Sequence, residues 1–218
     1  EGGAVDLDAC APLGRVISPA SQEDRQALGD FAAQDGYWRR KLAAMRPITL
    51  PLATTERAPS EHRALDLAPD AALVAIATWA ARLGGGEGAH LAYAGPAQAG
   101  VADLTCPWVP VAVDRLVEEI DEADARGPFA LDLFARDAAL DAAHRPHLGL
   151  RRAGAGLVPG TVLTVDLTDA PALLYDPARL SPAMADLLAE RLEALGRGES
   201  AAMPEAERRL TVEAWNRT

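Results

Sequence analysis

The sequence predicts an α/β layered sandwich, because strand-like and helix-like segments alternate along the chain. The clearest strand pattern is at residues 161–167, where β-branched and apolar residues alternate. Residues 70–83 are strongly apolar at helical spacing and are followed by three glycines that end a helix. Residues 182–195 form the last long helix, with Ser181 placed to cap it and Pro182 suited to its first turn.

Composition limits the chain of 218 residues to one domain with a sizeable core, or to two small lobes. The net charge of −11 argues against a nucleic acid as partner, because phosphate binding needs clustered Lys and Arg. No apolar run approaches the roughly 18–20 residues of a membrane span, and no signal-peptide pattern is visible. Cys10 and Cys106 are expected to be buried or free thiols in a reducing cytosol, which predicts a cytoplasmic location.

Shorter segments continue the alternation of helices and strands. A helix begins at Ser21, and the next helix carries Trp38 and Leu42 four residues apart on one face. Pro47 and Pro51 then force an extended segment. The remaining expected elements are strands at residues 62–67, 89–93, 108–113 and 172–175, and short helices at 116–125 and 129–135.

Two of these strands have a predicted place in the sheet. Pro110 interrupts the segment 108–113 and cannot donate to a strand ladder, so this strand is expected at an edge or at a bulge. Residues 172–175 follow the strand at 161–167 after a short break and are expected to pair with it.

Histidines and glycines that could bind a ligand have simpler interpretations. His144 and His147 have H-x-x-H spacing, but Pro146 breaks the helix that would aim them at one ion, so we expect a solvated loop. His90 lies in an apolar strand and is expected to be a hydrogen-bonded core histidine. The glycine-rich stretch 84–88 leads into a strand, whereas a phosphate-binding loop leads into a helix.

Other candidate groups also lack the context that their chemistry needs. Residues 154–156 read Gly-Ala-Gly and are too short to mean more than a turn. No G-x-S-x-G elbow for a serine nucleophile is present. Glu118, Glu119, Asp121 and Asp124 lie on one helix flank and are interpreted as a solvated face, because an acid/base pair would need a cleft. We therefore assign no catalytic, cofactor-binding or metal-binding residue.

The most specific pattern is at residues 207–218, which read E-R-x-L-x-x-E-x-W-N-x-T. This run resembles the segment that leaves a condensation domain of a nonribosomal peptide synthetase and enters the next adenylation domain. Other matches occur in the family's order. They are the Y-W-x-x-x-L stretch at 37–42 leading into 48–54, the strand at 91–96, the segment at 108–114, Tyr175-Asp176, the helix that follows, and 203–208.

The resemblance covers about residues 25–218 and implies the C-terminal lobe of a chloramphenicol-acetyltransferase-like fold. Condensation domains work with an H-H-x-x-x-D-G motif in the first half of that fold, and we expect that half to precede this sequence. The one H-x-x-x-D here runs from His62 to Asp66, without a tandem His or a Gly. It also follows the Y-W stretch instead of preceding it, so we interpret the pair as a chance polar edge.

The resemblance therefore predicts a leader at 1–20, a condensation-like lobe at 21–198 and a linker at 199–218. The predicted role is non-catalytic: a platform for an adenylation domain in cis, with a carrier protein as a further candidate partner, in antibiotic or other secondary-metabolite biosynthesis. No cofactor is expected, since phosphopantetheine and ATP/Mg belong to the neighbouring domains.

Leu210, Trp215 and Arg217 of the linker are the candidates for contact with the adenylation domain, because interfaces are enriched in Trp and Arg anchors. Two alternatives remain open at this point. The chain is half of a condensation-type acyltransferase whose catalytic half is supplied elsewhere, or it is an unrelated acyltransferase-like fold with a coincidental tail.

Overall fold

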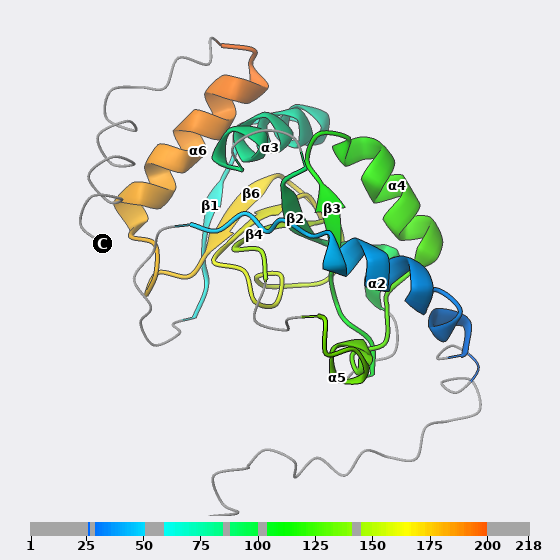
Figure 1. The fold of residues 1–218 in the computed structure, drawn as a ribbon. Helices are drawn as coiled ribbons and strands as arrows, with labels where there is room; N and C mark the ends of the chain where they lie inside the picture. Colours follow the sequence, from blue (N-terminus) through cyan, green and yellow to red (C-terminus); the bar gives the residue numbers. More distant parts are fainter. Residues whose placement is uncertain are drawn as a thin grey trace, which may run out of the picture.

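The computed structural model describes residues 26, 29–50, 59–84, 88–99, 104–140 and 145–199. In these ranges six strands form one mixed sheet in the order β1-β6-β5-β4-β2-β3. The strands are β1 (Glu61–Ala64), β2 (His90–Ala94), β3 (Val109–Ala112), β4 (Leu148–Arg151), β5 (Leu163–Asp166) and β6 (Ala172–Tyr175). The helices are α2 (Asp35–Ala43), α3 (Pro69–Leu83), the 3-10 helix η2 (Pro96–Ala99), α4 (Leu116–Arg126), α5 (Leu133–Arg136) and α6 (Pro182–Gly196) (Figure 1).

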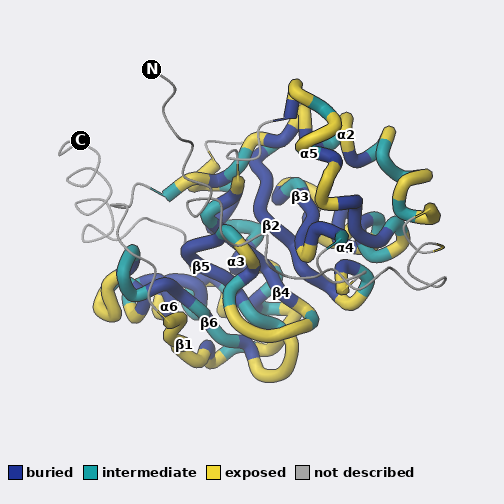
Figure 2. Tube along the Cα trace, turned by 90° about the horizontal axis from the view of Figure 1, so that it is seen from below, coloured by how far each residue is buried: buried dark blue, intermediate teal, exposed yellow. Residues whose placement is uncertain are grey.

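The centre of the sheet is parallel and its two ends are antiparallel. Strand β4 lies between β2 and β5 and runs parallel to both. At one end β6 pairs antiparallel with β5 and β1, and at the other end β3 pairs antiparallel with β2. Figure 2 shows the central strands buried and the outer sides of the helices exposed. None of the helices in the described ranges is long and apolar enough to cross a membrane.

Alternation along the strands assigns their side chains to two faces of the sheet. Leu150 of β4 is in register with Tyr93 of β2 and Val165 of β5, so these three side chains share one face. The hydroxyl of Tyr93 donates to Asp124 of α4 at 3.0 Å and 3.1 Å from its two oxygens. Helix α4 therefore covers this face of the sheet, which we call the helix face.

Helices α6 and α3 cover the helix face at the other end of the sheet. Val165 is in register with Leu173 of β6, which in turn pairs with Arg63 of β1. The Arg63 guanidinium contacts Asp186 of α6 at 2.9 Å. Helix α3 packs alongside α6, and both lie above the sheet in Figure 1. Ser181 caps α6 by accepting a hydrogen bond from the Met184 amide, as the sequence predicts.

The opposite face is covered in two different ways. Next to β3 an aromatic cluster covers it, formed by Trp38 of α2, Trp108 and Phe129. Over β4 and β5 it is covered by residues 152–161, which we call the strap, and we name this part of the sheet the strap face. The strap joins two neighbouring parallel strands with no helix, although such crossovers usually contain one.

An extended segment closes the sheet at the amino ends of β2 and β4. The Ile48 amide donates to the His90 carbonyl at 3.0 Å, and the His147 amide donates to the Ile48 carbonyl at 2.8 Å. Ile48 is buried, so this segment adds to the core. The prediction that Pro47 begins an extended segment is confirmed for residues 45–50, while Pro51 lies outside the described residues.

Most predicted elements are present, and the differences are local. Strand β3 is an edge strand, as Pro110 indicates, and β6 pairs with β5. The strand predicted at 62–67 ends at Ala64, and the helix predicted at 129–135 is one turn, Leu133–Arg136, because Ala130 forms a bridge with Thr105. Strand β4 was not predicted. The proposed boundaries at 1–20 and 199–218 lie almost wholly outside the described residues and stay predictions.

Candidate functional site

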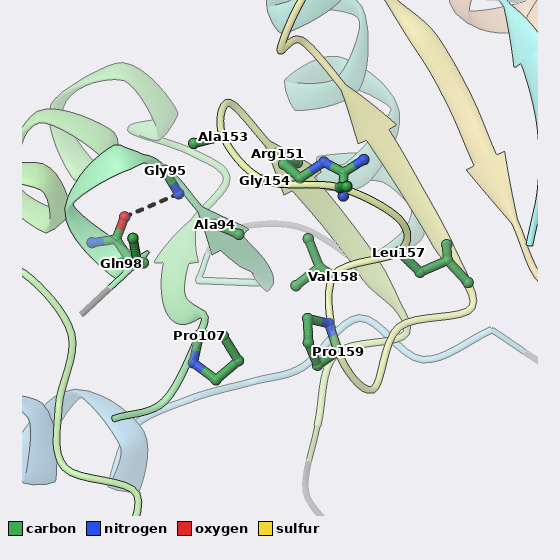
Figure 3. A pocket seen from close by; sticks show the side chains of 12 residues that line it. Ala94, Gly95, Gln98, Pro107, Arg151, Ala153, Gly154, Leu157, Val158 and Pro159 are labelled. Carbon is green, nitrogen blue, oxygen red and sulfur yellow. Dashed lines mark hydrogen bonds between the residues drawn. The ribbon is translucent and has the colours of Figure 1, made fainter. Parts of the chain in front are cut away.

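A cavity of about 210 Å³ lies at the carboxyl ends of the parallel strands β2 and β4. One wall is the end of β2 with η2 and Pro107, and the other wall is the strap together with Arg151 at the end of β4. Figure 3 shows Ala94 and Val158 on opposite sides of the space, with Pro107 and Pro159 along its lower edge. Ligands of open α/β sheets bind beyond the carboxyl ends of strands, so this cavity is the candidate binding site.

The β2 wall is fixed by hydrogen bonds that occupy its polar groups. The Gly95 amide donates to Gln98 Oε1 at 3.0 Å, and Gln98 Nε2 donates to the Ala123 carbonyl at 3.0 Å. A Cβ atom at Gly95 would lie 2.1 Å from the Tyr93 hydroxyl oxygen, so only glycine fits where β2 turns into η2. Because the Gln98 amide is fully buried and engaged on both sides, it shapes the wall.

Arg151 ties the strap wall to the sheet. Its Nη2 contacts Asp166 Oδ2 of β5 at 2.8 Å, and its Nη1 donates to the Gly156 carbonyl of the strap. Burial alone raises the pKa of Asp166, but hydrogen bonds from Arg151 and Thr168 outweigh it and hold that pKa below its usual range. Arg151 is thus a charged side chain that is 4% exposed and is neutralised on one side by β5.

The floor beneath the strap is made of small and hydroxyl residues. Thr164 Oγ1 accepts from the Val158 amide at 3.0 Å and lies 2.9 Å from Thr161 Oγ1. Thr161 Oγ1 also lies 2.7 Å from the Val158 carbonyl. At Gly149 an added Cβ would lie 2.8 Å from Thr164 Oγ1, so the strap can approach β4 because that position has no side chain. The short turn expected at 154–156 is therefore part of a longer covering segment, the strap.

This arrangement favours binding over acid/base chemistry. The walls are mostly apolar, and the charged side chain among them, Arg151, is already paired with Asp166. In the described ranges no group of three His, Cys, Asp or Glu side chains could hold a metal ion. Cys106 precedes Pro107 and is a buried free thiol, and burial raises its pKa to about 12. Cys10 lies outside the described residues.

The histidines identified in the sequence are separate from the cavity. His62 lies on the exposed edge strand β1, whereas Asp66 follows the end of that strand, where its amide donates to Glu193 Oε1 at 2.9 Å. His90 is the core histidine that was predicted: it is buried, and its Nδ1 is 2.8 Å from the Gly88 carbonyl. Burial lowers the pKa of His90.

The solvated loop expected around His147 is wrong for that residue. The Leu50 amide donates to His147 Nδ1 at 3.0 Å, so the half-buried ring fastens the extended segment to the start of β4. Burial, followed by the nearby Arg179 charge, lowers the pKa of His147. His144 lies outside the described residues.

The solvated face expected on α4 is also only partly correct. Glu119 is 4% exposed; it pairs with Lys41 of α2 and with Arg115, and it accepts from the Ala112 amide at 3.2 Å. Asp124 accepts the Tyr93 hydroxyl. Both carboxylates hold helices to the sheet. Sequence alone could not show this, because Lys41 lies far from Glu119 along the chain.

The six-stranded α/β sandwich has the fold of condensation domains of nonribosomal peptide synthetases, which confirms the predicted fold class with its chloramphenicol-acetyltransferase-like architecture. No protein-family model matches the chain, and no curated protein matches it. The likeness to known proteins therefore rests on solved structures alone.

Three solved structures illustrate the likeness. A complex of the X-domain and OxyB from teicoplanin biosynthesis has 20% identity and a TM-score of 0.52 over 80% of this chain and 55% of that chain. A structure described as CT has 12% identity and a TM-score of 0.53 over 83% and 55%. The starter condensation domain of rhizomide synthetase has 14% identity and a TM-score of 0.50 over 80% and 53%. The chain thus spans about half the length of the structures that it matches.

The linker candidates Leu210, Trp215 and Arg217 lie outside the described residues, so their predicted contacts stay predictions. The cavity, by contrast, was missed by sequence reasoning. Its side wall at Arg151 belongs to strand β4, which has no alternating pattern in the sequence.

Proposed function

We propose that this chain is the C-terminal lobe of a condensation-like domain in a nonribosomal peptide synthetase and acts as a non-catalytic platform for an adenylation domain. The observation that carries the proposal is the combination of a condensation-domain fold with the E-R-x-L-x-x-E-x-W-N-x-T run at residues 207–218. The order of the other matching segments supports the C-terminal position.

The placement of the polar residues supports a non-catalytic role. His62 is exposed on an edge strand, and Asp66 lies beyond the end of that strand. His90 and His147 are occupied by backbone hydrogen bonds. A general base must reach the proton it abstracts, and none of these side chains lines the cavity.

The linker supplies the proposed contact with the adenylation domain, through Leu210, Trp215 and Arg217. An aromatic side chain next to a cation is a common interface anchor, since it buries a large area and still forms hydrogen bonds. The carrier protein is a second proposed partner, whose path the platform would set. In this proposal phosphopantetheine and ATP/Mg are bound by the neighbouring domains.

Calorimetry of the chain with the adenylation domain of its own assembly line tests the proposal. We expect binding at micromolar concentration or tighter, which corresponds to about 8 kcal/mol or more. Removal of residues 208–218, or Trp215→Ala with Arg217→Ala, should weaken binding at least tenfold. Val74→Ala is the control, because this side chain is 61% exposed on α3 and lies outside the linker. Unchanged affinity after truncation would contradict the anchor.

The alternative proposal is that this chain is half of a condensation-type acyltransferase. The cavity at the carboxyl ends of β2 and β4 favours this alternative. Here the lobe would contribute substrate contacts, while a partner with the H-H-x-x-x-D-G motif would supply the base. Mixing the chain with such a partner and assaying amide formation between carrier-bound aminoacyl groups tests it. Activity from the chain alone that is lost in His62→Ala would overturn the non-catalytic role.

A further inference from the structure

The strap is attached unevenly to the sheet. At its start the Arg152 amide donates to the Ala94 carbonyl at 2.9 Å, and at its end Val158 and Thr161 are tied to Thr164. Between these attachments lies an arch, residues 153–157, for which the described residues show no backbone–backbone hydrogen bond. The arch is held by packing and by one side chain, the guanidinium of Arg151, which donates to the Gly156 carbonyl.

The arch also has the backbone features of a segment that can change conformation locally. Gly154 has φ of 90° and Gly156 has φ of 77°, a region that other residues rarely adopt. Nothing lies within 4 Å of a Cβ built on either glycine, so the space around the arch is open. Its middle residue, Ala155, is exposed.

Arg151 is fixed independently of the arch. The ion pair with Asp166 at 2.8 Å ties the guanidinium to β5 through a contact in which the arch takes no part. Nε of Arg151 is buried without a hydrogen-bond partner. A buried donor without a partner is unfavourable, and water would satisfy it once the arch lifts.

We propose that the arch is a latched cover of the cavity and that Arg151 is the latch. In the closed state Arg151 holds Gly156, and Ala153, Gly154 and Leu157 form one wall of the space (Figure 3). In the open state the arch swings away about its two glycines, while Val158 and Thr161 stay on Thr164. The cavity then becomes a groove at the carboxyl ends of β2 and β4.

A spin label on the arch tests this inference. Ala155→Cys in a Cys10→Ser background carries a nitroxide, since Cys106 is buried. The EPR spectrum should contain an immobile and a mobile component. Arg151→Lys keeps a cation beside Asp166 but cannot hold both partners, so the ratio of mobile to immobile label should rise about tenfold, as expected for losing one charge-assisted hydrogen bond. Arg63→Lys, at the distant pair with Asp186, should leave the ratio unchanged.

A second variant keeps the test valid if Arg151→Lys does not fold. Gly156→Ala leaves Arg151 and Asp166 intact, meets no neighbour and strains only the closed backbone, so it should also increase the mobile component. In the wild-type chain the Arg151 Nε proton should exchange with water through the same opening, and faster in Gly156→Ala. A label that stays immobile in every folded variant would overturn the latch. The test needs no adenylation domain, so its outcome is independent of the proposed function.

Discussion

The two faces of the sheet are built from the same strands but are held by different forces. On the helix face Leu150, Leu163 and Val165 are fully buried under α3, α4 and α6. On the strap face the next residues along these strands, Gly149 and Thr164, meet a segment without a helix. The helix face is therefore stabilised mainly by apolar area removed from water, whereas the strap face depends more on a few directed hydrogen bonds.

This difference indicates that one face of the sheet contributes global stability while the other permits local conformational change. Apolar packing is non-directional and spreads over many contacts, so the helix face should respond to mutation as part of the whole domain. Hydrogen bonds are local, so the strap face can change while the sheet stays folded. The candidate cavity is lined by the strap, where a local change of conformation should require the least free energy.

The largest expected effect is on the helix face. Leu163→Ala removes a side chain with no exposed surface and should lower the free energy of unfolding by about 2–5 kcal/mol. Urea unfolding measures it. Leu131→Ala, at a side chain that is 44% exposed, is the control and should stay within about 0.5 kcal/mol of wild type. A smaller loss for Leu163→Ala than for the strap-face variants below would reverse the comparison.

An intermediate effect is expected from the ion pair of the strap face, and it should depend on pH. Asp166→Asn should cost about 1.5–3 kcal/mol near neutral pH by weakening the charged hydrogen bond to Arg151. The pKa of Asp166 is depressed in the folded chain, so its contribution is present above the unfolded-state pKa and is lost as pH falls through the folded-state pKa.

The difference between wild type and Asp166→Asn should accordingly shrink in acid, whereas the cost of Leu163→Ala should not change with pH. Urea titrations at about pH 7 and about pH 3 distinguish the two. A cost for Asp166→Asn that is constant across this range would show that the carboxylate charge contributes nothing.

The hydroxyl floor beneath the strap should give a smaller effect of about 1–2 kcal/mol. Thr164→Val keeps the shape of the side chain but removes the acceptor for the Val158 amide, leaving that donor unpaired. Hydrogen exchange should rise at Val158 and remain unchanged at Leu150, which is in the sheet. Equal increases at both amides would mean that strap and sheet open together.

The smallest effect is expected at the surface of the helix face. Arg63→Gln breaks the pair with Asp186, whose side chains are 43% and 58% exposed, and should cost about 0.5 kcal/mol or less. Added salt should remove even this difference, since exposed charges are screened. A loss above about 1 kcal/mol, measured by urea unfolding, would mean that this pair is more than a surface contact.

Sequence patterns predicted the parts of the fold that depend on local signals. The Ser181 cap, the apolar face of α3 and the edge position of Pro110 are each determined by a few neighbouring residues. Strand β4 was missed because its four residues, Leu148 to Arg151, include a glycine and a charge, and their burial is created by neighbours on both sides.

The candidate site was missed for the same physical reason. Arg151 is buried because Asp166 and the strap surround it, and Glu119 is buried because Lys41 reaches it from another helix. Such pairings depend on tertiary contacts that carry no periodic signal. By contrast, short runs of residues near the chain's ends carry the family resemblance, which predicted the condensation-domain fold. Hydrophobic periodicity alone would not have distinguished these runs from ordinary surface helices.

The ends of the sheet have a consequence for solubility. An exposed edge strand can pair with another copy of the chain and begin aggregation. At one edge β3 carries Pro110, which has no amide hydrogen to offer a new strand. At the other edge β1 is exposed along its whole length and presents Glu61, His62 and Arg63. Charged side chains on an edge strand disfavour pairing with a further strand, so both edges of the six-stranded sheet in the described residues are protected against it.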